Sequence, residues 1–334
     1  MFPEKIEQAY ELLLEGSQLL QNVLESNFFE GYIENGGNVI EGYTTKVVDD
    51  VPNEETTTHL NELYRKLQAL DLAPEEWRKV AQLVLLKGSV TEPLQANHQL
   101  TPDSIGFLFV FLIEQLYAGK KEVTILDNTI GMGNLLLTVL TNLALAGIKG
   151  EAYGVDVDDT LLTIAAVNAD MTGVDLQLFH QDGVGDLKIE PVDVVIGDLP
   201  VGYYPDDKKA ARYQMFSKVG HTYAHHLLIE QGMKQVKEGG FGIFLVPTNL
   251  FSSEQSKQLK EWMENSAYLQ GIIQLPENLF KTENAQKNIV LFQKHGGDAK
   301  QAQVLVASLN SLTEPTKIQL FFKQFLNWKE NNNF

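Results

Sequence analysis

The chain has 334 residues, a net charge of −18, 44% hydrophobic residues and no cysteine. The lack of cysteine excludes disulfides, thiolate metal sites and cysteine nucleophiles, and the seven histidines show no metal-ligand spacing, so we expect no metal. No apolar run approaches the roughly 18 residues of a membrane helix, and the acidic N-terminus MFPEKIEQAYELLLEG lacks the basic region of a secretory signal, which favours a cytoplasmic protein with no membrane partner.

Residues 1–95 are predicted to form a helical domain, since a chain of this length favours two domains. Apolar residues recur at helical spacing in three segments, residues 3–27, 59–70 and 75–86. Asn53 and Pro74 are typical of helix starts. No catalytic pattern stands out here. We therefore expect a docking or dimerisation surface, for a homodimer or another protein.

Residues 96–334 are predicted to form the second domain, an α/β fold with a doubly wound, mostly parallel sheet. A helix capped at Thr101 comes first. Short apolar runs predict strands at 123–126, 151–157, 176–179, 192–197, 241–246, 269–275, 288–292 and 303–307. Helical patterns lie between them at 133–146, 159–171, 222–237 and 252–265, and a terminal helix follows. Such sheets bind ligands at the carboxyl ends of their strands.

A glycine turn follows the first predicted strand. In LDNTIGMGNLL, Asp127 ends the strand, and Gly131 and Gly133 lie in the turn that opens the next helix. Glycines let the backbone approach a ligand closely, and the helix N-terminus offers free N–H groups to a carboxylate or phosphate. A plain tight turn is the alternative interpretation.

Acidic residues also follow the next two strands. Asp156 ends the second strand about 25 residues after the glycines, where it can accept hydrogen bonds from both ribose hydroxyls. Asp182, after the third strand, is placed to accept from an adenine amine. Leu136 stands where a dinucleotide-binding turn has its third glycine, which favours a nucleoside without a pyrophosphate. Each aspartate alone also fits a solvated loop or a helix cap.

The fourth strand runs into Asp198-Leu199-Pro200-Val201, in the sequence DLPVGYYP. A strand followed by [N/D/S]-P-P-[Y/F] is the active-site loop of amino-methyltransferases. Three further segments match in order: HQLTPDSIGFLF (98–109), EGGFGIFLVPTNLF (238–251) and LQGIIQLPENLFKTENAQKNIVLFQK (269–294). Over about residues 97–294 the chain resembles the N6-adenine DNA methyltransferases of the type I restriction M-subunit kind. It resembles a Gram-positive subfamily of these class I, Rossmann-like, S-adenosylmethionine-dependent enzymes.

The resemblance implies S-adenosylmethionine as the cofactor. It implies that Thr101 binds the methionine carboxylate, that Asp156 binds the ribose and that Asp182 binds the adenine. It further implies that the methionine moiety and the rest of the pocket involve Asp127, Thr129, Gly131, Gly133, Asn134, Val157, Gly183 and Asp198. In catalysis, the Asp198 carboxylate and the Leu199 carbonyl, held by Pro200, would accept hydrogen bonds from the target amine and restore its nucleophilicity.

The chain departs from the family pattern at two positions of this loop. Val201 replaces the aromatic that stacks on a flipped base, a contact worth about 1–3 kcal/mol. Tyr203 and Tyr204 are the candidates to replace it. Leu199 stands in place of the first proline. After Phe292 only about 40 residues follow, too few for a separate target-recognition domain.

The distribution of charge along the chain indicates how strongly it can bind a nucleic acid. Residues 1–200 carry a net charge of −21 and residues 201–334 carry +3. The one basic aromatic stretch holds Lys208, Lys209, Arg212 and Lys218. We therefore expect binding to DNA or RNA that is weak and not sequence-specific.

Three functions stay open on the sequence alone. The first is N6-adenine-type methyl transfer to DNA or another nucleic acid, with the roles given above. The second is N-methyl transfer to a protein or small-molecule amine or amide. The third is a non-catalytic relative that binds the cofactor.

Overall fold

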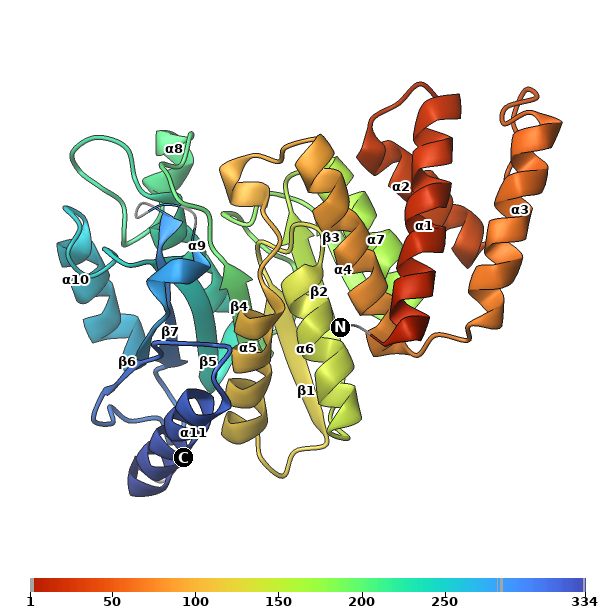
Figure 1. Cartoon of the computed structure of the whole chain (residues 1–334). Coiled ribbons are helices and arrows are strands. Elements are labelled where there is room, and N and C mark those ends of the chain that lie inside the picture. The colour runs from red at the N-terminus through yellow and green to blue at the C-terminus, as the bar shows by residue number, and fades with distance from the viewer. Residues whose placement is uncertain (1–2, 281, 283–284, 333) are drawn as a thin grey trace.

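The computed structural model describes residues 3–280, 282, 285–332 and 334. Its described part contains a sheet of eight strands with helices on both faces and a bundle of helices at one end (Figure 1). The strands are β1 (Glu122–Asp127), β2 (Lys149–Asp156), β3 (Leu176–His180), β4 (Val192–Asp198), β5 (Val236–Pro247), β6 (Ala267–Gln274), β7 (Lys287–Lys294) and β8 (Leu305–Ser308). All eight predicted strands are present, and the mixed α/β class is confirmed.

The strands lie in the order β3-β2-β1-β4-β5-β7-β6-β8. Strand β7 runs antiparallel to both neighbours, whereas the other pairs are parallel. The parallel strands therefore end at one edge of the sheet, and β7 begins at that same edge. The first residues of β7 thus pair with the last residues of β5, the strand next to β4.

Helices cover both faces of the sheet. They are α5 (Asp103–Leu116), α6 (Asn134–Leu145), α7 (Asp159–Thr172), α8 (Asp207–Ala210), α9 (Ala224–Gln235), α10 (Ser256–Ser266) and α11 (Pro315–Asn332). One apolar core joins α5, α6 and α11 to the sheet, and a second core joins α9 and α10 to the opposite face. None of the helices in the described ranges is long and apolar enough to cross a bilayer.

The N-terminal helical domain contains α1 (Glu4–Val23), α2 (Phe28–Ile40), α3 (Glu54–Ala69) and α4 (Pro74–Thr91). Asn53 caps α3 and Pro74 begins α4, as predicted. The apolar periodicity did not single out α2, whose sequence holds several glycines. At Gly31 a Cβ would lie 2.6 Å from the Ser17 carbonyl oxygen, so this glycine lets α2 pack directly on α1. Tertiary packing here outweighs a low helix propensity.

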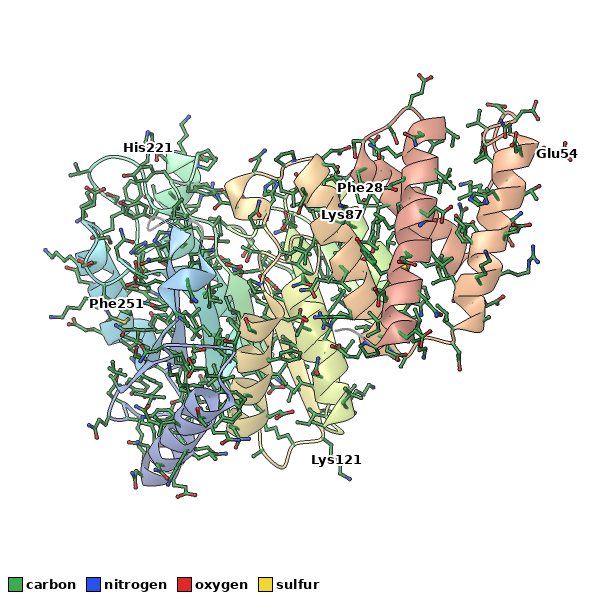
Figure 2. The ribbon with its side chains drawn as sticks, viewed as in Figure 1. Phe28, Glu54, Lys87, Lys121, His221 and Phe251 are labelled. Atoms are coloured by element: carbon green, nitrogen blue, oxygen red, sulfur yellow. The ribbon has the colours of Figure 1, made fainter. Side chains whose placement is uncertain are left out.

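The helical domain is joined to the sheet domain through buried contacts. Its apolar core includes Ile164 and Val167 of α7. A buried ion cluster adds to this, because the Arg78 guanidinium, 2% exposed, donates to Glu75 at 2.6 Å and to Asp103 of α5 at 3.0 Å. Figure 2 shows Glu54 on α3 at one end of the molecule and His221 at the other.

The Arg78 cluster gives a stability prediction. Arg78→Ala would leave the carboxylates of Glu75 and Asp103 without their guanidinium, and breaking a buried ion pair costs about 3–5 kcal/mol. We expect a loss of that order in the free energy of unfolding, measured by urea denaturation. Arg65→Ala, at an exposed position of α3, is the control and should change it by less than about 0.5 kcal/mol. Equal small losses in both variants would contradict a stabilising role for the cluster.

Candidate active site

A cavity of about 660 Å³ opens at the carboxyl ends of β1 and β4. This volume lies in the range of small-molecule sites. Its walls come from four segments, which precede α5, follow β1, follow β4 and precede β7. Six predicted site residues line it: Thr101, Asp127, Thr129, Gly131, Asn134 and Asp198. These six residues therefore lie together at one cavity, and the role of each there stays a prediction.

Thr101 joins two walls of the cavity. Its hydroxyl donates to Asp198 Oδ2 at 2.8 Å, and its carbonyl accepts from Asn134 Nδ2 at 2.5 Å. The prediction that Thr101 caps the following helix is wrong, because α5 begins at Asp103 with Pro102 at its N-cap and without a side-chain cap. The Thr101 hydroxyl is instead used to hold the carboxylate at the end of β4.

Asp127 lies at the base of the cavity, with only 1% of its surface exposed. Burial raises the pKa of its carboxyl to about 8; the backbone N–H of Thr129, 3.0 Å from Oδ1, opposes this, and the charges of Asp156 and Asp198 add to it. Near neutral pH this group therefore holds a proton unless a cation lies nearby. Such a carboxyl favours a ligand with a positive charge.

The glycine turn is fixed by Asp156. Gly131 and Gly133 have φ values of +54° and +84°, in the left-handed region that favours glycine. The Gly131 N–H donates to Asp156 Oδ2 at 2.8 Å, and the Asp158 N–H donates to Oδ1 at 2.9 Å. Asp156 thus lies behind the turn and outside the cavity lining, and its neighbour Val157 is exposed.

Asp182 is engaged by the segment that follows β4. Its Oδ2 accepts from the Tyr204 hydroxyl at 2.5 Å and from Lys209 Nζ at 2.6 Å. Burial and this hydrogen bond raise the pKa of Tyr204. A Cβ at Gly183 would lie 2.3 Å from the Asn128 carbonyl oxygen, so only glycine fits there. Neither Asp182 nor Gly183 lines the cavity, and adenine binding by Asp182 stays a prediction.

Lys287 is one of two site residues that the sequence did not reveal. Its Nζ donates to Asp198 Oδ1 at 2.5 Å and to the Leu199 carbonyl at 2.7 Å. The pair is largely buried, since the side chains of Lys287 and Asp198 are 14% and 22% exposed. The available signal was the hairpin formed by β6 and β7 within residues 269–294. Its second strand is antiparallel, so its first residue lies at the edge where the parallel strands end.

The rest of the loop is held from two sides. Asn97, also missed, accepts from the Val201 N–H at 3.0 Å and donates to the Val201 carbonyl at 3.1 Å. This clamp fixes Val201 on the cavity wall, so the position of the family aromatic is filled by an aliphatic side chain. Pro200 approaches the buried His225 through its backbone.

Tyr203 stacks away from the cavity lining. Its ring lies 4.8 Å from that of Tyr223, which in turn lies 5.1 Å from His225. Burial lowers the pKa of His225 to about 4 and that of His226 to about 3, so both rings are neutral at pH 7. They form a packed aromatic stack with Tyr223.

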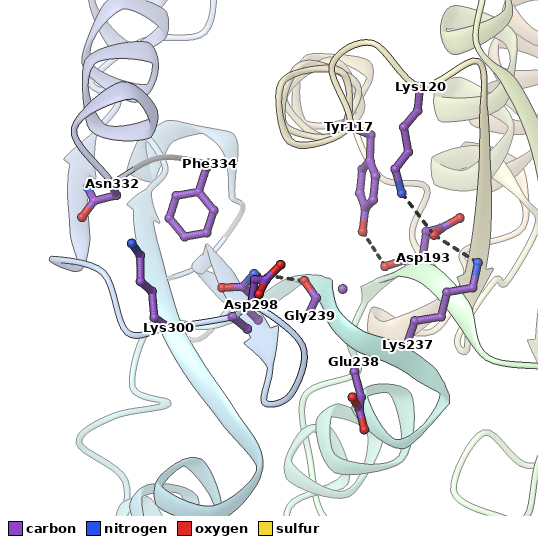
Figure 3. Close-up of a pocket in the computed structure, with 13 residues that line it drawn as sticks. Tyr117, Lys120, Asp193, Lys237, Glu238, Gly239, Asp298, Lys300, Asn332 and Phe334 are labelled. Carbon is purple, nitrogen blue, oxygen red and sulfur yellow. Dashed lines mark hydrogen bonds and ion pairs between the residues drawn. The ribbon is translucent and has the colours of Figure 1, made fainter.

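A second cavity, of about 360 Å³, lies at the opposite edge of the sheet (Figure 3). Asp193 at its wall pairs with Lys237 at 3.1 Å and with Lys120 at 3.7 Å. Burial alone would raise the pKa of Asp193, but hydrogen bonds from Thr124 and Lys237 hold it below its usual value. The main buried charge here is already compensated, which favours a structural role. Among the described residues there is no cluster suited to a metal ion.

The family model described as N-6 DNA Methylase matches residues 94–332, well over half of the chain. The chain belongs to the N-6 DNA methylase family. A second model, the YtxK N-terminal helical domain, matches residues 7–89. The first match covers the sheet domain described above, and the second covers the helical bundle.

Two full-length relatives agree with this assignment. YtxK of Bacillus subtilis is 38% identical over 333 residues, covering 98% of each chain. A Listeria monocytogenes protein, described as a candidate class I S-adenosylmethionine-dependent methyltransferase, is 40% identical with a TM-score of 0.89. That match covers 97% of this chain and 99% of the other.

A methyltransferase subunit of a type I restriction-modification system from Streptococcus thermophilus shares the fold. It is 15% identical with a TM-score of 0.66, over 94% of this chain and 74% of the other. This N-6 DNA methylase family member therefore has the class I methyltransferase fold, as the sequence predicted. The buried Asp127 and the open space beside Gly131 fit a cationic nucleoside cofactor of the kind such folds bind.

The glycine turn gives a second prediction. In Gly133→Ala the residue keeps an unfavourable positive φ, and the new Cβ would lie 3.3 Å from Ala165 and Leu137 side-chain atoms. We expect a loss of about 1–2 kcal/mol in the free energy of unfolding, measured by urea denaturation. The control is Gly37→Ala within α2, where no atom lies within 4 Å; it should gain about 0.5–1 kcal/mol. Tolerance of alanine at position 133 would show that the turn can relax.

Proposed function

We propose that this chain transfers a methyl group from S-adenosylmethionine to an amino group, and that the acceptor is the N6 amine of adenine in DNA or another nucleic acid. The proposal is supported most directly by one observation: the Asp198 carboxylate and the Leu199 carbonyl converge on a single nitrogen, that of Lys287. Two acceptors that bind one nitrogen are what an amine nucleophile needs.

The catalytic role we propose for the loop is positional and electrostatic. An exocyclic amine is a poor nucleophile because its lone pair is delocalised into the ring, and acceptors on both N–H bonds restore its reactivity. Asp198 and Leu199 would supply these acceptors, and the Leu199 N–H bonded to Leu245 at 3.0 Å holds the loop against β5. Fixed acceptors need no reorganisation during the reaction.

The cofactor site we propose is the cavity at the ends of β1 and β4. The cofactor would supply an activated methyl group on its sulfonium. We propose that Thr101, Asp127, Thr129, Gly131, Gly133 and Asn134 hold the methionine moiety, with Asp156 and Val157 near the ribose and Asp182 and Gly183 near the adenine. The positive charge of the cofactor would favour the ionised form of Asp127.

The partner we propose is a nucleic acid bound weakly and without sequence specificity. The basic stretch after the loop offers few free charges, because Lys209 already pairs with Asp182. Lys208, Arg212 and Lys218 are exposed. Tyr204 is bonded to Asp182, and Tyr203 lies at the exposed end of the aromatic stack, so Tyr203 is the better candidate for stacking on a base. We propose a cytoplasmic location and docking through the helical domain of residues 1–95.

A second candidate acceptor is an amine of a protein or small molecule. The specific observation that favours it is the ammonium of Lys287, since this shows that an alkylamine fits the two acceptors. A screen of tritiated methyl transfer to fractionated cellular DNA, RNA, protein and metabolites separates the two acceptors. Cofactor binding with no transfer to any fraction would indicate a non-catalytic relative.

Cofactor affinity should depend on pH through Asp127. A cation near this carboxyl favours its ionised form, so binding releases a proton whenever the pH lies below about 8. The ionised fraction of the free protein rises with pH, so affinity should increase by up to about fiftyfold from pH 6 to pH 8. Calorimetry with S-adenosylmethionine, which carries the sulfonium charge, measures the affinity at each pH, and buffers of different ionisation enthalpy report the proton released.

Asp127→Asn is the control for this pH dependence. It cannot exchange the proton, so its affinity should change less with pH, leaving only the titration of the ligand's own amine. Equal dependence of cofactor affinity on pH in the wild type and in Asp127→Asn would contradict the proposed role of this carboxyl. No detectable heat or thermal shift with the cofactor or its demethylated product would contradict the cofactor site itself.

The acceptor role of Asp198 is tested by substitution. Asp198→Ala should leave cofactor affinity nearly unchanged and lower turnover by about a hundredfold or more, because the lost acceptor acts mainly on the transition state. Turnover is measured with the acceptor that the tritium screen identifies. Asp170→Ala, which removes an exposed carboxylate of α7, should match the wild type. Full activity in Asp198→Ala would show that the loop is structural.

A further inference from the structure

We propose that Lys287 fills the acceptor-amine subsite of the resting protein, and that an acceptor must displace it to be methylated. Lys287 thereby determines which amines the site admits. The inference rests on the proposed function, because the subsite is defined by the two acceptors assigned to the target amine. The contacts that carry it are those of Lys287 Nζ with Asp198 Oδ1, at 2.5 Å, and with the Leu199 carbonyl, at 2.7 Å.

The ammonium and a target amine compete for the same atoms. Both oxygens of the Asp198 carboxylate already accept hydrogen bonds, Oδ2 from Thr101 and Oδ1 from Lys287. A target amine that reaches Asp198 Oδ1 and the Leu199 carbonyl together would have to lie where Nζ lies now. Both nitrogens cannot occupy that position, so binding of one excludes the other.

The sheet topology fixes the base of the Lys287 side chain. Lys287 is the first residue of β7 and pairs with Pro247 at the end of β5, while Asp198 pairs with Leu245 of the same strand. The backbone at both ends of the contact is thus held in the ladder. Displacement then requires only rotation of the four-carbon side chain, and Lys287 borders the cavity of about 660 Å³ that can receive it.

Charge decides how hard Lys287 is to displace. Among the described residues that line the cavity, Lys287 is the only lysine or arginine. A neutral amine in its place would donate the same two hydrogen bonds but would leave the Asp198 carboxylate without a countercharge. The apparent affinity for a neutral acceptor is therefore the intrinsic affinity multiplied by the fraction of molecules in which Lys287 has left the subsite.

Occupancy can be measured by the reactivity of lysine amines. The purified full-length protein is treated with limiting acetic anhydride, and each acetylated lysine is quantified by peptide mass spectrometry. We expect Lys287 to react several-fold more slowly than Lys257, whose side chain is 83% exposed. Asp198→Ala should raise the rate at Lys287 and leave that at Lys257 unchanged. Equal rates at the two lysines of the wild type would overturn the proposal.

Competition is measured by binding, so that it does not depend on turnover. Calorimetry with adenosine and with Nα-acetyl-lysine amide is carried out with S-adenosylhomocysteine in excess. We expect Lys287→Met, which keeps the aliphatic stem and removes the ammonium, to bind at least one probe about tenfold more tightly than the wild type. Lys287→Gln serves as a second variant if the first does not fold.

Lys294→Met is the matched control, because Lys294 is also on β7 but bonds to the carbonyls of Lys234 and Val236. It should bind both probes as the wild type does. If Lys287→Met binds both probes no more tightly than the wild type, Lys287 is a structural ion-pair partner and the proposal is wrong.

The proposed function fails by a different result. If neither the wild type nor Lys287→Met transfers tritium to any acceptor, methyl transfer is disproved, while the labelling and calorimetry still decide the place of Lys287. If the wild type and Lys287→Met both transfer tritium, Lys287→Met should transfer it faster at low acceptor concentration and at the same rate at saturation. The same rate at low concentration would count against displacement.

Discussion

The site is organised around the carboxylate of Asp198. One oxygen accepts from Thr101 before α5, and the other accepts from Lys287 at the start of β7. Three segments that are far apart in the sequence are therefore held at the carboxyl end of β4. Because the groups are largely removed from water, the ion pair and the hydrogen bond support each other more than they would at the surface. The connection thus joins three walls of the cavity.

The acidity of the chain affects the two proposed ligands, the cofactor and a nucleic acid, in opposite ways. Asp127, Asp156 and Asp198 end three adjacent parallel strands, so the topology places their carboxylates together. Burial raises the pKa of Asp127, and the charges of Asp156 and Asp198 add to this. This arrangement opposes the binding of a polyanion but favours the binding of a cofactor with a positive charge. Lys287 compensates part of the same charge. An acidic sequence and a methyltransferase site are thus compatible, provided that contact with a nucleic acid stays weak.

Much of the sheet and of the cavity follows from the sequence, because both rest on local signals. Apolar runs identified the strands, and strand ends identified Asp127 and Asp198. Lys287 and Asn97 could not be found this way, since their role depends on which distant segment lies opposite them. Helix α2 was missed for a similar reason: its glycines favour coil until α1 lies against Gly31. Thr101 matched a cap signal, but a tertiary partner took its hydroxyl.

The helical domain supports the glycine turn of residues 131–133. The Tyr32 hydroxyl of α2 donates to Asn168 Oδ1 at 2.5 Å, and Asn168 Nδ2 donates to the Met132 carbonyl, within the glycine turn, at 3.0 Å. Arg78 holds Asp103, two residues after Thr101. Both sides of the cavity are therefore braced by helices that carry no proposed catalytic residue. A partner that shifted α2 or α4 would act on the walls of the cavity through these buried bonds, so the proposed docking and the proposed cofactor binding would be coupled.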